Sequence, residues 1–179
     1  MNALRQDRQW KELIEQFGAE DFSSWPADMQ DKASEAFHLR GQIYSFLKDG
    51  PKAEADLKTS VKLAPNNSAF WITLADNSTN NLQDDEQALA AYRQAFAITG
   101  KGNGWQPLTA TIAIARLLTD QVKTDEALAV LKPYGDMKDM PPNWRIRMLR
   151  AYGHTYAAQG KEPQSLAKFR EALELESKP

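Results

Sequence analysis

Apolar side chains recur along this chain at the three- and four-residue spacing that is typical of α-helices. Phe37 and Gly41 share one helical face, and Ala53 and Leu57 share another. The segment Asp49-Gly50-Pro51 lies between these faces, and such capping and breaking residues end one helix and begin the next. No stretch alternates apolar and polar residues over the length of a strand. The pattern therefore predicts an all-α protein built from pairs of helices.

The same helix pair recurs four times along the chain. In the first helix of each pair a small residue returns at intervals of 34, 40 and 38 residues, as Gly41, Ala75, Ala115 and Gly153. In the second helix a small residue returns at intervals of 35, 39 and 38 residues, as Ala53, Ala88, Ala127 and Ser165. Because a small side chain lets two antiparallel helices approach to about 8–10 Å, we expect these positions to mark the closest crossing in each pair.

This arrangement resembles the tetratricopeptide repeat (TPR), a helix pair that repeats about every 34 residues. The resemblance implies a right-handed α-solenoid of antiparallel helix pairs, a TPR superhelix of about nine helices. The chain would then be a single TPR domain over residues 1–179, with repeats at 34–67, 68–105, 106–140 and 141–179. Residues 1–33 would form a half repeat or capping helix and a linker. Arg40 departs from the family pattern, which usually has Leu at that position.

The N-terminal segment has the pattern of the second helix of a further repeat. Trp10, Leu13 and Phe17 share one helical face within residues 5–18, and no matching first helix precedes them. This helix is either a lone cap or the remnant of a longer protein from which the chain was cut. We favour the second interpretation, because solenoid ends normally carry a polar cap and neither end of this chain shows one clearly.

The sequence contains few candidate catalytic residues. The chain has no cysteine, and its only histidines, His38 and His154, lie more than a hundred residues apart. No nucleophile elbow, HExxH motif or P-loop is present. The acidic run at 76–87 has Asn81 where a calcium loop needs Gly. We therefore expect a protein that is not an enzyme, with no catalytic residue, no metal site and no cofactor.

Charge and composition narrow the class of partner. The 22 Lys and Arg residues nearly balance 24 Asp and Glu residues. The resulting net charge of −2 disfavours non-specific electrostatic binding to nucleic acid. No apolar run approaches the roughly 18–20 residues that span a bilayer. The polar start is no signal peptide, but a leader could have been removed, so the compartment stays open: cytoplasmic, or periplasmic or secreted. We expect a soluble protein that binds a protein or peptide.

The family resemblance implies that the first helices line a concave groove, and helical spacing projects particular side chains into it. The predicted partner-binding residues are Glu35, His38, Gln42, Asp76, Ile112, Arg116, Arg147, Arg150 and His154. The same projection also places Ser45, Ile72, Thr79, Thr109 and Thr119 on this face.

Charge is unevenly distributed among these helices. Residues 76–95 carry four acids and one base, whereas residues 140–171 carry six bases and two acids. Since arginine binds a carboxylate with two parallel hydrogen bonds, Arg116, Arg147 and Arg150 are predicted to hold acidic side chains or a C-terminal carboxylate. The alternative is a solvated helix face whose charges keep the protein soluble.

These observations predict a non-catalytic scaffold that binds a peptide or partner helix in its groove. The alternative is an accessory TPR segment of a larger enzyme, or of a bacterial envelope or cytochrome-biogenesis assembly. The Lys and Asn clamp by which some members of the family hold chaperone C-termini is not present, because His38 and Gln42 stand at its first two positions. Self-association and the identity of the partner stay open.

Overall fold

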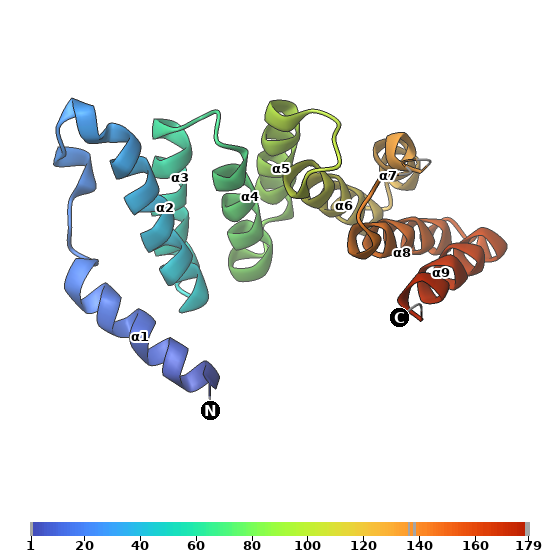
Figure 1. Cartoon of the computed structure of the whole chain (residues 1–179), viewed down its shortest axis with the longest axis horizontal. Coiled ribbons are helices and arrows are strands. Elements are labelled where there is room, and N and C mark those ends of the chain that lie inside the picture. The colour runs from blue at the N-terminus through green and yellow to red at the C-terminus, as the bar shows by residue number, and fades with distance from the viewer. Residues whose placement is uncertain (1, 136, 138, 178–179) are drawn as a thin grey trace. The chain divides into compact units, whose positions relative to one another are not determined.

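The fold is described by a computed structural model that covers residues 2–135, 137 and 139–177. Within these residues the chain forms nine α-helices and no strand (Figure 1). The helices are α1 (Asn2–Phe17), α2 (Gln30–Phe46), α3 (Gly50–Leu63), α4 (Ser68–Asn77), α5 (Asp85–Thr99), α6 (Trp105–Asp120), α7 (Thr124–Leu131), α8 (Pro142–Ala158) and α9 (Glu162–Glu176). Short turns of 3-10 helix occur at Phe22–Ser24, Ala27–Met29 and Lys132–Tyr134, and a π-helical turn, η3, covers Ser78–Leu82. The predicted all-α fold is confirmed.

The chain divides into two compact units, Met1–Gln94 and Ala95–Pro179. In the first unit α2 packs along α3, and α3 packs along α4. In the second unit α6 pairs with α7 and α8 pairs with α9, while α8 also contacts α6 and α7. Each unit therefore places the first helices of successive pairs, α2 and α4 or α6 and α8, in contact with each other.

The small residues of the repeat lie at tight crossings between paired helices. A Cβ atom added to Gly41 in α2 would lie 2.8 Å from Cγ of Leu57 in α3. A Cβ atom added to Gly153 in α8 would lie 2.8 Å from the ring of Phe169 in α9. The alanines of both series are fully buried, at Ala53, Ala75, Ala88, Ala115 and Ala127. A larger side chain at the two glycines would push the paired helices apart.

The helix pairs α2–α3, α6–α7 and α8–α9 share one turn geometry. The second residue after the first helix has a positive φ, and the amide of the next residue donates to a carbonyl five residues earlier, which is the Schellman arrangement. The positive-φ residues are Lys48, Val122 and Gly160. Glycine adopts this backbone readily, but a β-branched residue is strained there. Val122, with φ 63°, is therefore the strained member of the three.

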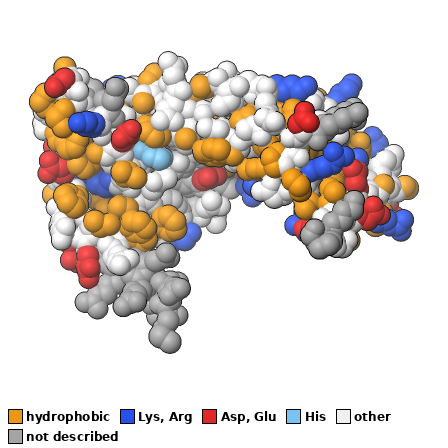
Figure 2. Space-filling view, viewed as in Figure 1, with side chains coloured by type: hydrophobic (Ala, Val, Ile, Leu, Met, Phe, Trp, Pro, Cys, Tyr) orange, Lys and Arg blue, Asp and Glu red, His pale blue; other side chains and the backbone are white. Residues whose placement is uncertain are grey.

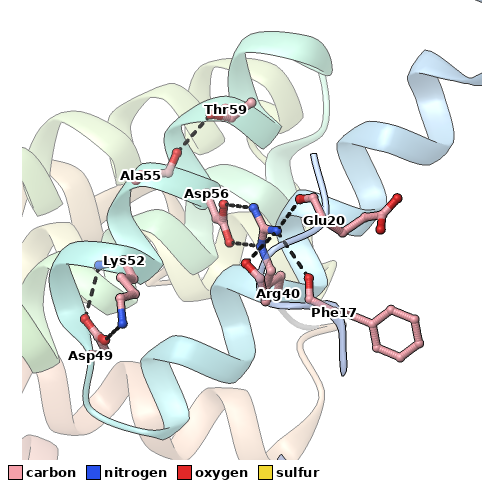
Figure 3. Close-up of polar contacts among 9 residues, drawn as sticks. Phe17, Glu20, Arg40, Asp49, Lys52, Ala55, Asp56 and Thr59 are labelled. Carbon is pink, nitrogen blue, oxygen red and sulfur yellow. Dashed lines mark hydrogen bonds and ion pairs between the residues drawn. The ribbon is translucent and has the colours of Figure 1, made fainter. Parts of the chain in front are cut away.

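Arg40 forms contacts that the leucine of the usual repeat pattern could not form at this position. Its guanidinium donates to the Asp56 carboxylate at 2.7 and 2.8 Å and to the carbonyl of Glu20 at 2.6 Å (Figure 3). It also lies 4.6 Å from the centroid of the Phe22 ring. The hydrogen bond to Asp56 raises the pKa of Arg40. A half-buried arginine thus joins the segment that follows α1 to the pair α2–α3.

Candidate partner-binding site

A cavity of about 540 Å³ in the second unit is lined, among the described residues, by side chains of α6 and α8. Helix α6 contributes Ile112, Arg116, Thr119 and Asp120, and helix α8 contributes Arg147, Arg150, Ala151 and His154. Five of the nine predicted partner-binding residues therefore line one cavity: Ile112, Arg116, Arg147, Arg150 and His154. We call this cavity the arginine cavity.

Helical spacing explains why these side chains converge. Along α6, Ile112 and Arg116 lie one turn apart, on a face that the buried residues Ala115 and Leu118 do not share. Along α8, Arg150 and Ala151 lie three and four residues after Arg147, and His154 lies one turn further along the same face. Because α6 and α8 pack against each other, these two helical faces border the same cavity.

The arginine cavity is positively charged. It contains three guanidinium groups and one carboxylate, that of Asp120. Arg116 and Arg147 are exposed and form no ion pair with any described residue. The guanidinium carbon of Arg147 lies 4.3 Å from the centroid of the Trp144 ring, a cation–π arrangement. Two arginines of the cavity are thus available to an external carboxylate.

Arg150 and His154 are both held by α9. Arg150 forms an ion pair with Glu176 at 2.7 Å, while it also lines the cavity. The His154 ring packs edge-on against Phe169, with ring centroids 5.1 Å apart. The second helix of the last pair therefore positions two side chains of the cavity.

A second cavity, of about 480 Å³, lies in the first unit and is mostly polar. It is lined by Gln42, Ser45, Phe46, Lys48, Thr73, Asp76, Asn80 and Asn81. Two predicted partner-binding residues, Gln42 and Asp76, are among them. Its polar groups largely bond to one another or to nearby helices: Asn81 donates to Ser45 and Asn77, and the Tyr92 hydroxyl donates to Asp76. This cavity offers fewer free groups to a ligand than the arginine cavity does.

The remaining two predicted residues line neither of these cavities. Glu35 is exposed on α2. The His38 ring stacks on Phe70 with centroids 4.2 Å apart, and its Nε2 lies 2.9 Å from Oγ1 of Thr73. Since the Thr73 hydroxyl donates to the carbonyl of Ala69, the imidazole Nε2 donates to Thr73. Burial lowers the pKa of His38 to about 4, so this histidine is a neutral link between α2 and α4.

The projection of Ile72 into the groove is wrong. Ile72 is only 4% exposed, and its neighbour Thr73 lines the cavity of the first unit instead. The predicted residue is off by one position along α4, which corresponds to a rotation of about 100° around the helix axis. Sequence reasoning also omitted Asp120 and Ala151, although each lies four residues after a residue that it had placed on the same face.

No three His, Asp or Glu side chains lie close enough together to hold a metal ion within the part of the chain that the structure describes. Among the same residues, no helix combines the length and apolar character that a membrane crossing requires.

Comparison with known proteins identifies one repeat by sequence. Residues 34–67 match the family model described as Tetratricopeptide repeat. No curated protein matches the chain. The recognition of this repeat from the residues alone is thus confirmed.

Solved structures extend the similarity to nearly the whole chain. A structure of MamA is 18% identical with a TM-score of 0.67, over 95% of this chain and 86% of that one. Tetratricopeptide-like repeats of a putative kinesin light chain from Podosopora anserina are 18% identical with a TM-score of 0.76, over 98% and 92%. BtubC from P. vanneervenii is 14% identical with a TM-score of 0.72, over 98% and 74%. At these identities the comparison confirms the predicted solenoid fold.

Proposed function

We propose that this chain, which carries a tetratricopeptide repeat at residues 34–67 and has the fold of TPR proteins, is a non-catalytic scaffold that binds an acidic peptide or partner helix. TPR arrays are in general scaffolds for protein–protein interaction. The binding site is the arginine cavity between α6 and α8.

The convergence of Arg116, Arg147 and Arg150 on one cavity carries this proposal. The cavity volume of about 540 Å³ lies within the range of about 300–1,000 Å³ typical of ligand sites. A guanidinium holds a carboxylate through two parallel hydrogen bonds, so three of them favour a ligand with several acidic side chains or a free C-terminus.

Apolar side chains in the same cavity refine the class of ligand. Ile112 and Ala151 are half-buried between the charged groups. A ligand that carried only carboxylates would leave this apolar surface uncovered, whereas an aliphatic side chain would bury it. The cavity therefore suits a peptide in which acidic and aliphatic residues alternate or lie one helical turn apart.

The proposal is tested by titrating the chain into a fluorescein-labelled dodecapeptide of alternating glutamate and leucine and measuring the affinity. The double variant Arg116→Glu/Arg147→Glu changes two cavity residues that form no ion pair within the part of the chain that the structure describes. We expect its affinity for the peptide to fall about tenfold or more, because like charges would face each other across the contact. Arg93→Glu/Arg170→Glu, two exposed arginines outside the cavity, is the control of equal charge. Equal affinity of both double variants for the peptide would overturn the proposal.

An accessory role in a larger enzyme or bacterial envelope assembly is the second candidate. Hydrophobic side chains gather over α1 and α2 on the face shown in Figure 2. On these two helices Phe17, Leu39 and Phe46 are each more than half exposed. Exposed apolar patches of this kind favour coverage by another protein surface. Sedimentation velocity of the unchanged chain and of Phe17→Ser/Phe46→Ser compares their oligomeric states, and so tests whether a second copy of the chain covers this patch. An unchanged monomer would leave a different protein as the partner.

A further inference from the structure

Arg150 already has a carboxylate partner within the chain. Its Nη2 donates to Oε1 of Glu176, the last residue of α9, at 2.7 Å. Both side chains are largely solvent-accessible, with 50% of Arg150 and 37% of Glu176 exposed. Only one of the guanidinium nitrogens bonds to this carboxylate, so the pair does not use the two-point geometry that arginine offers.

The other acidic contact between α8 and α9 is of a different kind. Glu171 accepts from Arg145 at 3.3 Å and from Lys168 at 3.1 Å, and none of these three residues lines the arginine cavity. Among the described residues, Arg150 is the cavity arginine that also forms an ion pair inside the chain.

We propose that Glu176 is an internal competitor for the ligand carboxylate that the arginine cavity binds. In the free chain Glu176 holds Arg150, and a ligand carboxylate displaces it to form a two-point pair. This inference rests on the function proposed above and adds a form of regulation to the same site.

The chain's own sequence around Glu176 has the chemistry that the cavity favours in a ligand. The last turns of α9 read Leu173-Glu174-Leu175-Glu176, an alternation of aliphatic and acidic residues. Exposed ion pairs contribute little to stability because solvent screens them and both side chains lose freedom. Glu176 can therefore be displaced at small cost, and it weakens ligand binding about two- to fivefold rather than blocking it.

The experiment uses the full chain and the same labelled glutamate–leucine dodecapeptide. Glu176→Gln removes the internal carboxylate and keeps the size of the side chain. Glu174→Gln is the matched control, because it removes an equal charge only two residues away from Glu176. The Glu174 side chain is exposed and forms no ion pair with any described residue. We expect Glu176→Gln to bind the peptide two- to fivefold more tightly than the unchanged chain, and Glu174→Gln to bind it within about 1.5-fold of the unchanged chain.

Each outcome decides one of the two claims. A gain confined to Glu176→Gln, and absent when Arg150→Gln is added, supports internal competition. Equal affinities for both glutamine variants would overturn internal competition and leave the proposed function standing. No binding of the peptide to any variant would overturn the proposed function and this inference with it.

Discussion

The guanidinium of Arg40 and the carboxylate of Asp56 form a two-point ion pair between α2 and α3, with N–O distances of 2.7 and 2.8 Å. The side chains are only 13% and 9% exposed, so the pair is shielded from water. The remaining Arg40 donors bond to carbonyls just after α1, including that of Glu20 at 2.6 Å. One side chain therefore satisfies a buried acid and a helix end together.

Replacing Arg40 should destabilise the first unit more than a surface substitution would. Arg40→Leu leaves Asp56 as an unpaired buried charge, and breaking such a pair costs about 3–5 kcal/mol of the free energy of unfolding. Urea denaturation measures this loss. The double variant Arg40→Leu/Asp56→Leu should regain most of it, because no buried charge remains. A double variant as unstable as the single one would mean that the carbonyl contacts dominate.

Stability should decline in mild acid because of His38. Its pKa is about 4 in the folded chain, against an ordinary value of 6.5, so between these pH values the unfolded chain takes up a proton that the folded chain does not. The free energy of unfolding therefore falls as the pH drops below 6.5 and is unaffected by His38 above it. With allowance for solvent screening, we expect a loss of about 1 kcal/mol between pH 7 and pH 5.

His38→Gln is the control for this pH dependence. Its amide can still donate to Thr73 but does not titrate in this range. Urea unfolding at pH 7 and pH 5 should show a smaller change in stability for this variant than for the unchanged chain. An identical pH dependence in the two proteins would rule out His38 as its source.

Relieving the backbone strain at Val122 should stabilise the second unit. Val122 has φ 63° and is 79% exposed, so its side chain contributes little packing that would be lost. Val122→Gly should raise the free energy of unfolding by about 1 kcal/mol, since glycine adopts a left-handed backbone without steric cost. Thermal unfolding checks this, with Gly160→Val expected to have the opposite effect at the corresponding turn. A lower melting temperature for Val122→Gly would contradict the account of strain.

A methyl group at the α2–α3 crossing should be costly despite the helix preference of alanine. In Gly41→Ala the new Cβ would lie 2.8 Å from Leu57 and 3.2 Å from the carbonyl of Ala53. Overpacking costs about 1–3 kcal/mol, against a gain of about 1 kcal/mol in helix propensity. Urea denaturation should therefore show a net loss of about 1 kcal/mol. Gly102→Ala, whose nearest neighbour is 3.7 Å away, should be nearly neutral.

The helix pairs and one face of the site could be predicted from the sequence because both depend on local spacing. The recurrence of Gly41, Ala75, Ala115 and Gly153 marks the crossings, and steps of three and four residues bring Arg147 and Arg150 to one face. The assignment failed for Ile72, because a small error in helical phase moves a side chain from the cavity into the core.

The contacts between distant residues could not be predicted in this way. Spacing along α2 does not distinguish Gln42, which lines a cavity, from His38, which binds Thr73 on another helix. Likewise, the pairing of Arg150 with Glu176 depends on how α8 and α9 pack and on two side-chain conformations. Neither property has a signature in a single sequence.

The most direct test of partner binding is an amide NMR titration of the labelled chain with the glutamate–leucine dodecapeptide. We predict that chemical-shift changes concentrate in α6 and α8, around Arg116, Arg147 and Arg150, and that they disappear in Arg116→Glu/Arg147→Glu. Changes confined to the apolar surface of α1 and α2, around Phe17 and Phe46, would contradict the assignment of the binding site to the arginine cavity.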